Sequence, residues 1–294
     1  MAERRRRPLC RTLRSLHAFA LFLTHLQTKI NPFLLELRPK IQTEGAFSVI
    51  EVSHLTKQYG RHLAVDDVSF TVEDGRIYGL LGPNGAGKST IMNILTGYLA
   101  ATSGQVTVAG HPLPEEAEAA KACVGYLPEQ PPLYPEMTVG EYLDFAAELK
   151  GVKKADRKQQ VQRAAKRTGL ENVLSRLIRS LSKGYKQRVG IAQALLGSPK
   201  CIILDEPTVG LDPAQVIEMR KLIRELGQSH TVILSSHILS EVQAVCQQVL
   251  ILSKGKLVAA GSLPELTADG RSLEEVFLAL TGAASEEMEE EENG

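Results

Sequence analysis

The sequence predicts an α/β fold built around a mostly parallel sheet. Short apolar segments with the character of buried strands alternate with longer segments of helical periodicity, which is the pattern of βαβ units. Early strand segments lack helices between them, and this predicts an added antiparallel layer. The stretch 138–196 is rich in Ala, Leu, Glu, Lys and Arg and predicts a helical subdomain.

Alternating apolar and polar residues, bounded by turn residues, place the individual elements. Strands are expected over 49–55, 68–72, 76–81, 105–108, 124–127, 201–204 and 231–234, with a strand pair over 249–260. Helices are expected over 91–99, 112–122, 214–227 and 238–247, and through most of 138–196.

Charge is concentrated at the two ends of the 294-residue chain. Residues 1–47 carry nine Lys and Arg against three Glu in a basic amphipathic pattern, which predicts either a poorly ordered extension or a helix on a membrane surface. The segment 282–294 contains six Glu and predicts a disordered acidic tail. The remaining domain, 48–281, is near neutral, which argues against a nucleic-acid-binding protein.

Cysteines and apolar runs indicate the compartment. The four cysteines are far apart and form no C-x-x-C pair, which favours a reducing cytosol and no zinc site. No run approaches the roughly 18 consecutive apolar residues of a membrane-spanning helix. If the protein serves a membrane, a separate chain is expected to provide the spanning part.

A glycine-rich turn between a strand-like and a helix-like segment has the spacing G-x-x-x-x-G-K-[ST]. Such a loop surrounds phosphates with backbone N–H groups at the positive end of a helix dipole. Lys88 supplies a cation for the outer phosphates, and Ser89 the hydroxyl expected on Mg²⁺. The sequence therefore predicts a phosphate-loop (P-loop) NTPase core. The expected nucleotide-binding residues are Gly82, Pro83, Asn84, Gly85, Ala86, Gly87, Lys88, Ser89 and Thr90.

A second motif, CIILDEP over 201–207, is an apolar strand that ends in two carboxylates. Asp205 is suited to hold Mg²⁺, directly or through water. Glu206 is suited to polarise the attacking water as a general base. Together with the phosphate loop, this motif predicts ATP hydrolysis.

The segment LSKGYKQR over 181–188 resembles the signature of the ATP-binding cassette (ABC) ATPases, usually written LSGGQ. It lies between the phosphate loop and the acidic strand, as it does in that family. Other family motifs are matched, in family order, by Tyr59 (the aromatic that stacks on adenine), Gln130 (the Q-loop), Asp212 (the D-loop) and His237 (the switch histidine).

The resemblance implies a mechanism in which two cassettes face each other head to tail and trap two ATP molecules, with Mg²⁺. Ser182 and Gly184 would touch the partner's ATP, and Asp212 would carry contact across the homodimer or heterodimer. Gln130 would bind at the nucleotide and sense Mg²⁺. The implied catalytic residues are Lys88, Glu206 and His237, and the implied metal ligands are Ser89, Gln130 and Asp205.

The signature departs from the family pattern at Lys183 and Tyr185. Signatures of this form, and the ending over 272–281, look like those of single-cassette ATPases paired with a separate ABC-2 membrane subunit. This implies an ATP-hydrolysing subunit, peripheral on the cytoplasmic face of the cell membrane, that powers a separate membrane-spanning exporter subunit. The alternative is a non-transport cassette, such as a cluster-assembly ATPase.

Overall fold

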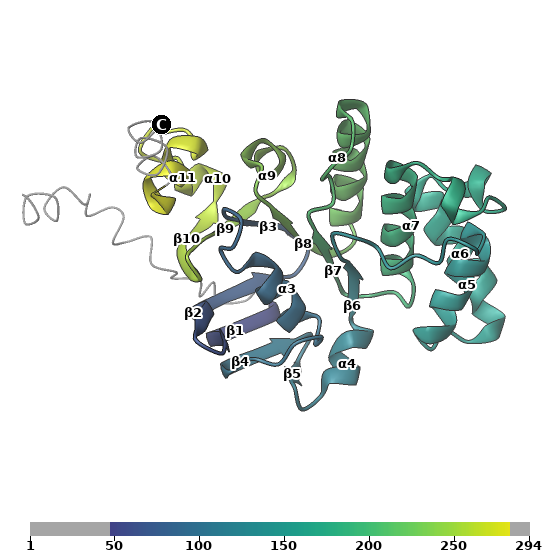
Figure 1. Cartoon of the computed structure of the whole chain (residues 1–294), viewed down its shortest axis with the longest axis horizontal. Coiled ribbons are helices and arrows are strands. Elements are labelled where there is room, and N and C mark those ends of the chain that lie inside the picture. The colour runs from purple at the N-terminus through teal and green to yellow at the C-terminus, as the bar shows by residue number, and fades with distance from the viewer. Residues whose placement is uncertain (1–47, 283–294) are drawn as a thin grey trace, which may run out of the picture. The chain divides into compact units, whose positions relative to one another are not determined.

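The computed structural model describes residues 48–282 (Figure 1). The predicted basic extension, 1–47, lies outside the described residues, and so does the predicted acidic tail from residue 283 onward. Within the described range, no helix is both long enough and apolar enough to cross a membrane.

A six-stranded sheet, in the order β10-β9-β3-β8-β7-β6, confirms the predicted parallel core. Its strands pair in parallel except at the β9–β10 edge, which is antiparallel. β3 and β7 are buried along their whole length, as expected for strands covered on both faces. The strands are β3 (Ile77–Leu81), β6 (Val124–Leu127), β7 (Cys201–Asp205), β8 (Thr231–Ser236), β9 (Gln248–Ser253) and β10 (Lys256–Ser262).

A second, antiparallel sheet has the order β2-β1-β4-β5 and confirms the predicted added layer (Figure 1). Val68, Phe70 and Val72 of β2 share one hydrophobic core with Ile91 and Met92 of helix α3, so the phosphate-loop helix packs on this sheet. The elements are β1 (Ser48–Tyr59), β2 (His62–Glu73), β4 (Ser103–Val108), β5 (His111–Leu113) and α3 (Lys88–Leu95).

The helical subdomain is present and has a hydrophobic core of its own. Its first helix begins at a capping box, in which Thr138 and Glu141 satisfy each other's backbone N–H groups. In Figure 1 its three α-helices lie together beside β6 and β7. They are α5 (Val139–Leu149), α6 (Lys154–Thr168) and α7 (Lys183–Leu195), with short 3₁₀ turns η1 (Glu171–Val173) and η2 (Ile178–Ser180).

The segment 112–122, expected to be helical, is divided into strand β5 and helix α4 (Ala117–Ala122). Pro112 and Pro114 have no backbone N–H for an interior helical hydrogen bond, and this favours the edge strand that forms instead. The other helices are α8 (Pro213–Gly227), α9 (Leu239–Val245), α10 (Leu263–Leu266) and α11 (Leu273–Thr281).

Candidate nucleotide and catalytic site

The phosphate loop connects β3 to α3, as its spacing predicts. Gly85 and Gly87 have φ angles of 79° and 102°, in the left-handed region that favours glycine. A methyl group on Gly87 would lie 2.6 Å from the carbonyl oxygen of Ala64, so space as well as backbone conformation requires glycine there. The loop therefore has the compact form that surrounds an anion at a helix N-terminus.

Lys88 is buried, with 6% of its surface exposed. Its ammonium donates to the carbonyl oxygens of Gly82 at 2.7 Å and Pro83 at 3.2 Å, and lies 3.8 Å from Oε1 of Glu206. Burial lowers the pKa of Lys88 from its ordinary value, while the charges of Glu206 and Asp205 oppose that shift. Incoming phosphate oxygens would replace loop carbonyls as acceptors for this cation.

The two carboxylates lie at the carboxyl end of β7, next to β8, where Asp205 pairs with Ser235 in the parallel register. The hydroxyl of Ser235 donates to Oδ1 of Asp205 at 2.5 Å and accepts from the N–H of Glu206 at 2.9 Å. Ser235 thus orients both consecutive acidic residues. Glu206 has φ 46°, an uncommon value for a residue with a side chain, so the chain turns sharply between the two acids.

Glu206 also lies against the predicted switch histidine. Its Oε1 is 3.0 Å from Nδ1 of His237, and its Oε2 is buried without a hydrogen-bond partner among the described residues. A buried carboxylate oxygen without a partner is costly in a folded protein unless a water or ligand satisfies it. Glu206 therefore has one oxygen that contacts His237 and a second, buried oxygen that a water molecule reaches only if the surrounding side chains move.

A cavity of about 480 Å³ is lined by Lys88, Glu206 and His237, whereas Asp205 is buried beside it and is not among the lining residues. Tyr59 and His62, which pair across the β1–β2 hairpin, form one wall, and the ring of Tyr59 is 46% exposed. The sequence predicts Tyr59 but not His62, because a single histidine beside a turn does not by itself indicate a binding site. The predicted residues that line the cavity are Tyr59, Asn84, Gly85, Gly87, Lys88, Ser89, Thr90, Glu206 and His237.

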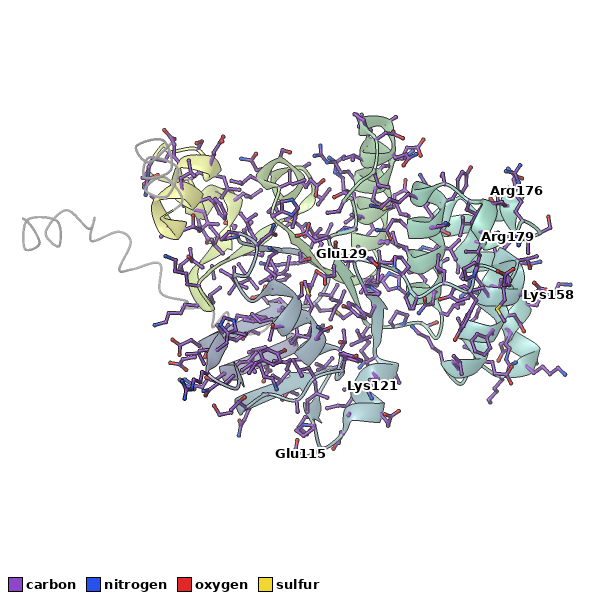
Figure 2. All side chains as sticks on the ribbon, viewed as in Figure 1. Glu115, Lys121, Glu129, Lys158, Arg176 and Arg179 are labelled. Atoms are coloured by element: carbon purple, nitrogen blue, oxygen red, sulfur yellow. The ribbon has the colours of Figure 1, made fainter. Side chains whose placement is uncertain are left out.

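Gln130, the predicted Q-loop residue, lines a different, neighbouring cavity of about 280 Å³. Its neighbour Glu129, labelled in Figure 2, lines both cavities. The carbonyl oxygen of Glu129 accepts a hydrogen bond from the amide of Gln187 on α7 at 3.4 Å. The sequence does not predict Glu129, since two adjacent polar residues after a strand do not indicate which one lies at the nucleotide cavity.

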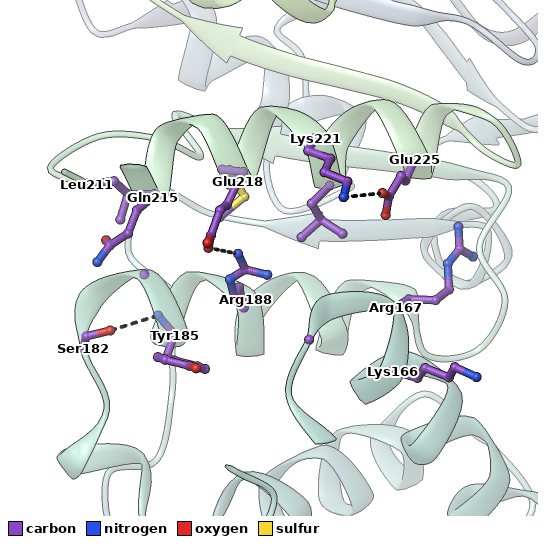
Figure 3. Close-up of a pocket in the computed structure, with 14 residues that line it drawn as sticks. Lys166, Arg167, Ser182, Tyr185, Arg188, Leu211, Gln215, Glu218, Lys221 and Glu225 are labelled. Atoms are coloured by element: carbon purple, nitrogen blue, oxygen red, sulfur yellow. Dashed lines mark hydrogen bonds and ion pairs between the residues drawn. The ribbon is translucent and has the colours of Figure 1, made fainter. Parts of the chain in front are cut away.

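The signature residues lie apart from the nucleotide cavity. Ser182 caps α7 by accepting from the N–H of Tyr185, and with Gly184 it lines a cavity of about 620 Å³ between α7 and α8 (Figure 3). Asp212 caps α8, where its Oδ1 accepts from the N–H of Gln215 at 2.9 Å. Within one chain the phosphate loop and the signature therefore face different cavities.

The donor set of the site fits a nucleoside triphosphate. It offers a glycine loop, a buried lysine, a serine hydroxyl at the helix start and a strand-end aspartate, which match phosphate and Mg²⁺ chemistry. The phosphate-facing part of the site lies where β3, β8 and β7 end side by side.

Comparisons with known proteins agree with this geometry. The protein-family model described as ABC transporter matches residues 65–209. An ABC transporter ATP-binding protein of Bacillus subtilis, YxlF, described as uncharacterized, is 39% identical over 74% of this chain and 72% of its own length. The lantibiotic transport ATP-binding protein SrtF of Streptococcus pyogenes is 36% identical over 78% of this chain and 96% of its own length.

A solved structure of an ATP-binding subunit of an ABC transporter superposes with a TM-score of 0.71. It is 32% identical, and the match covers 79% of this chain and 99% of that one. Fold, family motifs and relatives agree, and the resemblance noted in the sequence is confirmed. The chain belongs to the ATP-hydrolysing, ATP-binding subunits of ABC transporters.

Proposed function

We propose that this chain is the ATPase subunit of an exporter. It would work as two cassettes paired head to tail, on the cytoplasmic face of the membrane, with a separate membrane-spanning subunit. The observation that carries the proposal is the separation, within one chain, of Ser182 and Gly184 from the cavity that holds Lys88 and Glu206. A signature that acts on ATP from outside its own nucleotide cavity needs a second cassette. The lantibiotic transport role of SrtF supports export.

In this proposal the residues of one cassette bind ATP and activate the water, and the signature of the other cassette completes the site. Lys88 and the loop N–H groups would bind the phosphates, and Ser89 and Asp205 would hold Mg²⁺, which would neutralise charge on the transferring phosphoryl group. Glu206 would accept a proton from the attacking water, while His237 holds Oε1 of its carboxylate.

Mixing two inactive variants tests the head-to-tail pairing. Lys88→Ala damages the phosphate loop and leaves the signature intact, whereas Ser182→Arg blocks the signature and leaves the loop intact. In a head-to-tail heterodimer one of the two composite sites contains neither change. The mixture should therefore hydrolyse ATP faster than either variant by itself. A mixture no more active than its components, with both variants folded, would contradict the pairing.

Purification from membranes tests the partner. The tagged chain should co-purify with a polytopic membrane protein, and mass spectrometry of the complex would identify that chain. Recovery of the cassette with soluble proteins only would contradict the transport role and favour a non-transport cassette.

A further inference from the structure

Lys183, one of the two departures in the signature, begins helix α7 directly after its cap, Ser182. The side chain turns back within its own chain toward the D-loop, the segment 208–213. A methyl group built on Gly210 would lie only 2.2 Å from Nζ of Lys183, so the ammonium rests directly on this glycine. Gly210 has φ 69°, so a side chain there would be strained as well as crowded.

This contact belongs to the interface of α7 with the D-loop and α8, here called the α7–α8 seam. Figure 3 shows the two helices side by side. A methyl group on Gly184 of the signature would lie 2.7 Å from Oε1 of Gln215, so α8 in turn covers the signature glycine. Further along the same helices, Arg188 and Glu218 form an ion pair of 2.6 Å. The signature is therefore in contact with the D-loop at one place and with α8 at two.

Gly210 is connected to the catalytic glutamate by a short, hydrogen-bonded segment. The N–H of Leu211 donates to the carbonyl oxygen of Thr208 at 3.1 Å, and the N–H of Val209 donates to that of Glu206 at 3.3 Å. These two overlapping turns hold Gly210 in a fixed position relative to Glu206. A displacement of Gly210 therefore reaches the backbone of Glu206, which already has an uncommon φ of 46°.

We propose that Lys183 is a positioning residue that holds the D-loop of its own cassette and, through Gly210 and the following turns, the orientation of Glu206. This inference rests on the proposed head-to-tail function. The signature of one cassette binds the partner's ATP, while Glu206 of the same cassette acts on its own ATP. Lys183 then connects the two ATP sites through one contiguous set of contacts. The lysine that departs from the family signature acts within its own cassette rather than on the partner's phosphate.

The test compares Lys183→Met with a matched control in the same seam. Lys183→Met should lower kcat for ATP by about tenfold, as a misplaced catalytic group does, and leave KM within about twofold. Lys183→Arg should restore most of the rate, because it keeps a long cationic side chain. The control, Glu218→Gln, breaks the Arg188 ion pair without touching the D-loop and should keep nearly wild-type kcat.

A second variant tests the route through Gly210. Gly210→Ala strains the backbone at φ 69° and also displaces the ammonium that Lys183→Met removes, so only the strain remains as an added cost in the double variant, which should lose less activity than the two single losses combined. Additive losses would mean that Lys183 acts elsewhere and would overturn the proposal.

Dimer formation separates this proposal from the proposed function. In a Glu206→Gln background, Lys183→Met should still form an ATP-dependent dimer. A raised KM of the Lys183→Met single variant, or loss of the dimer in the Glu206→Gln background, would place Lys183 on the partner's nucleotide, and equal effects of Lys183→Met and Glu218→Gln would reduce its role to packing. If Glu206→Gln by itself never dimerises with ATP, the head-to-tail function fails, whereas the kcat effect of Lys183→Met can still be measured.

Discussion

Oε1 of Glu206 lies 3.0 Å from Nδ1 of His237, across the carboxyl ends of two neighbouring parallel strands. The same oxygen is 3.8 Å from the ammonium of Lys88. One carboxylate oxygen thus meets both a histidine and a phosphate-loop cation, while the second oxygen has no partner among the described residues. This arrangement separates the positioning of Glu206 from its action on water, and the predictions on Glu206 and Lys88 depend on it.

Glu206→Gln should preserve the shape of the site and remove the base. The amide can still accept from His237, so Mg-ATP should bind, hydrolysis should slow by about 10²–10⁴-fold, and an ATP-locked dimer should accumulate. Sizing chromatography with Mg-ATP, beside a single-turnover rate, measures both effects. Asp205→Asn is the matched comparison and should weaken Mg²⁺ use as well as the rate. A monomeric Glu206→Gln protein with near-normal turnover would be incompatible with the general-base role.

Lys88→Ala should lose most ATP hydrolysis. The ammonium is buried and placed for charge-assisted bonds to phosphate, worth about 1.5–3 kcal/mol in binding and more in the transition state. Nucleotide titration and steady-state turnover measure the two losses, and circular dichroism checks the fold. Lys256→Ala, which removes an exposed cation paired with Asp66, is the control. Wild-type turnover in folded Lys88→Ala would remove the phosphate-loop assignment.

Glu129→Ala should reduce ATP hydrolysis, by about tenfold, and raise the Mg²⁺ concentration needed for half-maximal rate, because Glu129 lines the nucleotide cavity. Gln130→Ala should have a smaller effect, since Gln130 lines the neighbouring cavity. Rates across a Mg²⁺ titration at fixed ATP compare the two. The opposite order of effects would restore Gln130 as the metal-sensing residue that the sequence predicts.

Lys150 should make the stability of the helical subdomain depend on pH. Its ammonium bonds to the carbonyl oxygens of Ala194 and Leu196, both at 3.2 Å, and burial lowers its pKa to about 8 from an ordinary 10.5. Between pH 8 and 10.5 the amine of Lys150 is protonated more fully in the unfolded chain than in the folded chain. The free energy of unfolding therefore increases as pH rises through this range.

The measurement is denaturant unfolding of wild type and Lys150→Met from pH 7 to 10. The free energy of unfolding of wild type, relative to that of Lys150→Met, should rise above pH 8 by at most about 1.4 kcal/mol per pH unit. Lys158→Met, which changes an exposed lysine on α6, should show no such trend. Parallel curves for wild type and Lys150→Met would contradict the shift.

Removal of residues 1–47 should leave the ATPase rate of the purified cassette nearly unchanged, because every residue of the nucleotide cavity lies between Tyr59 and His237. If the segment is a membrane-surface helix, the truncated protein should bind anionic liposomes less well than the full chain. A collapse of soluble ATPase activity would contradict both predictions for this segment.

Local pattern was sufficient for much of the site. The spacing of the phosphate loop and the apolar strand before Asp205 and Glu206 each depend on residues adjacent in sequence, and both are present as predicted. Turns and caps are set by short-range hydrogen bonds and allowed φ and ψ values, so a short segment carries enough information for them. The division of 112–122 was missed, because helical composition there competes with two prolines.

Only the tertiary structure decided which side chains meet. Whether Glu129 or Gln130 faces the nucleotide cavity depends on how the chain leaves β6 and packs against α7. The contact of Lys183 with Gly210 joins the start of α7 to the D-loop, which lie more than twenty residues apart in sequence. Contacts of this kind follow from the order of strands in the sheet and the packing of helices on it. The strand order and the helix packing depend on the total apolar surface that the whole domain buries. The periodicity of a short segment does not indicate that total.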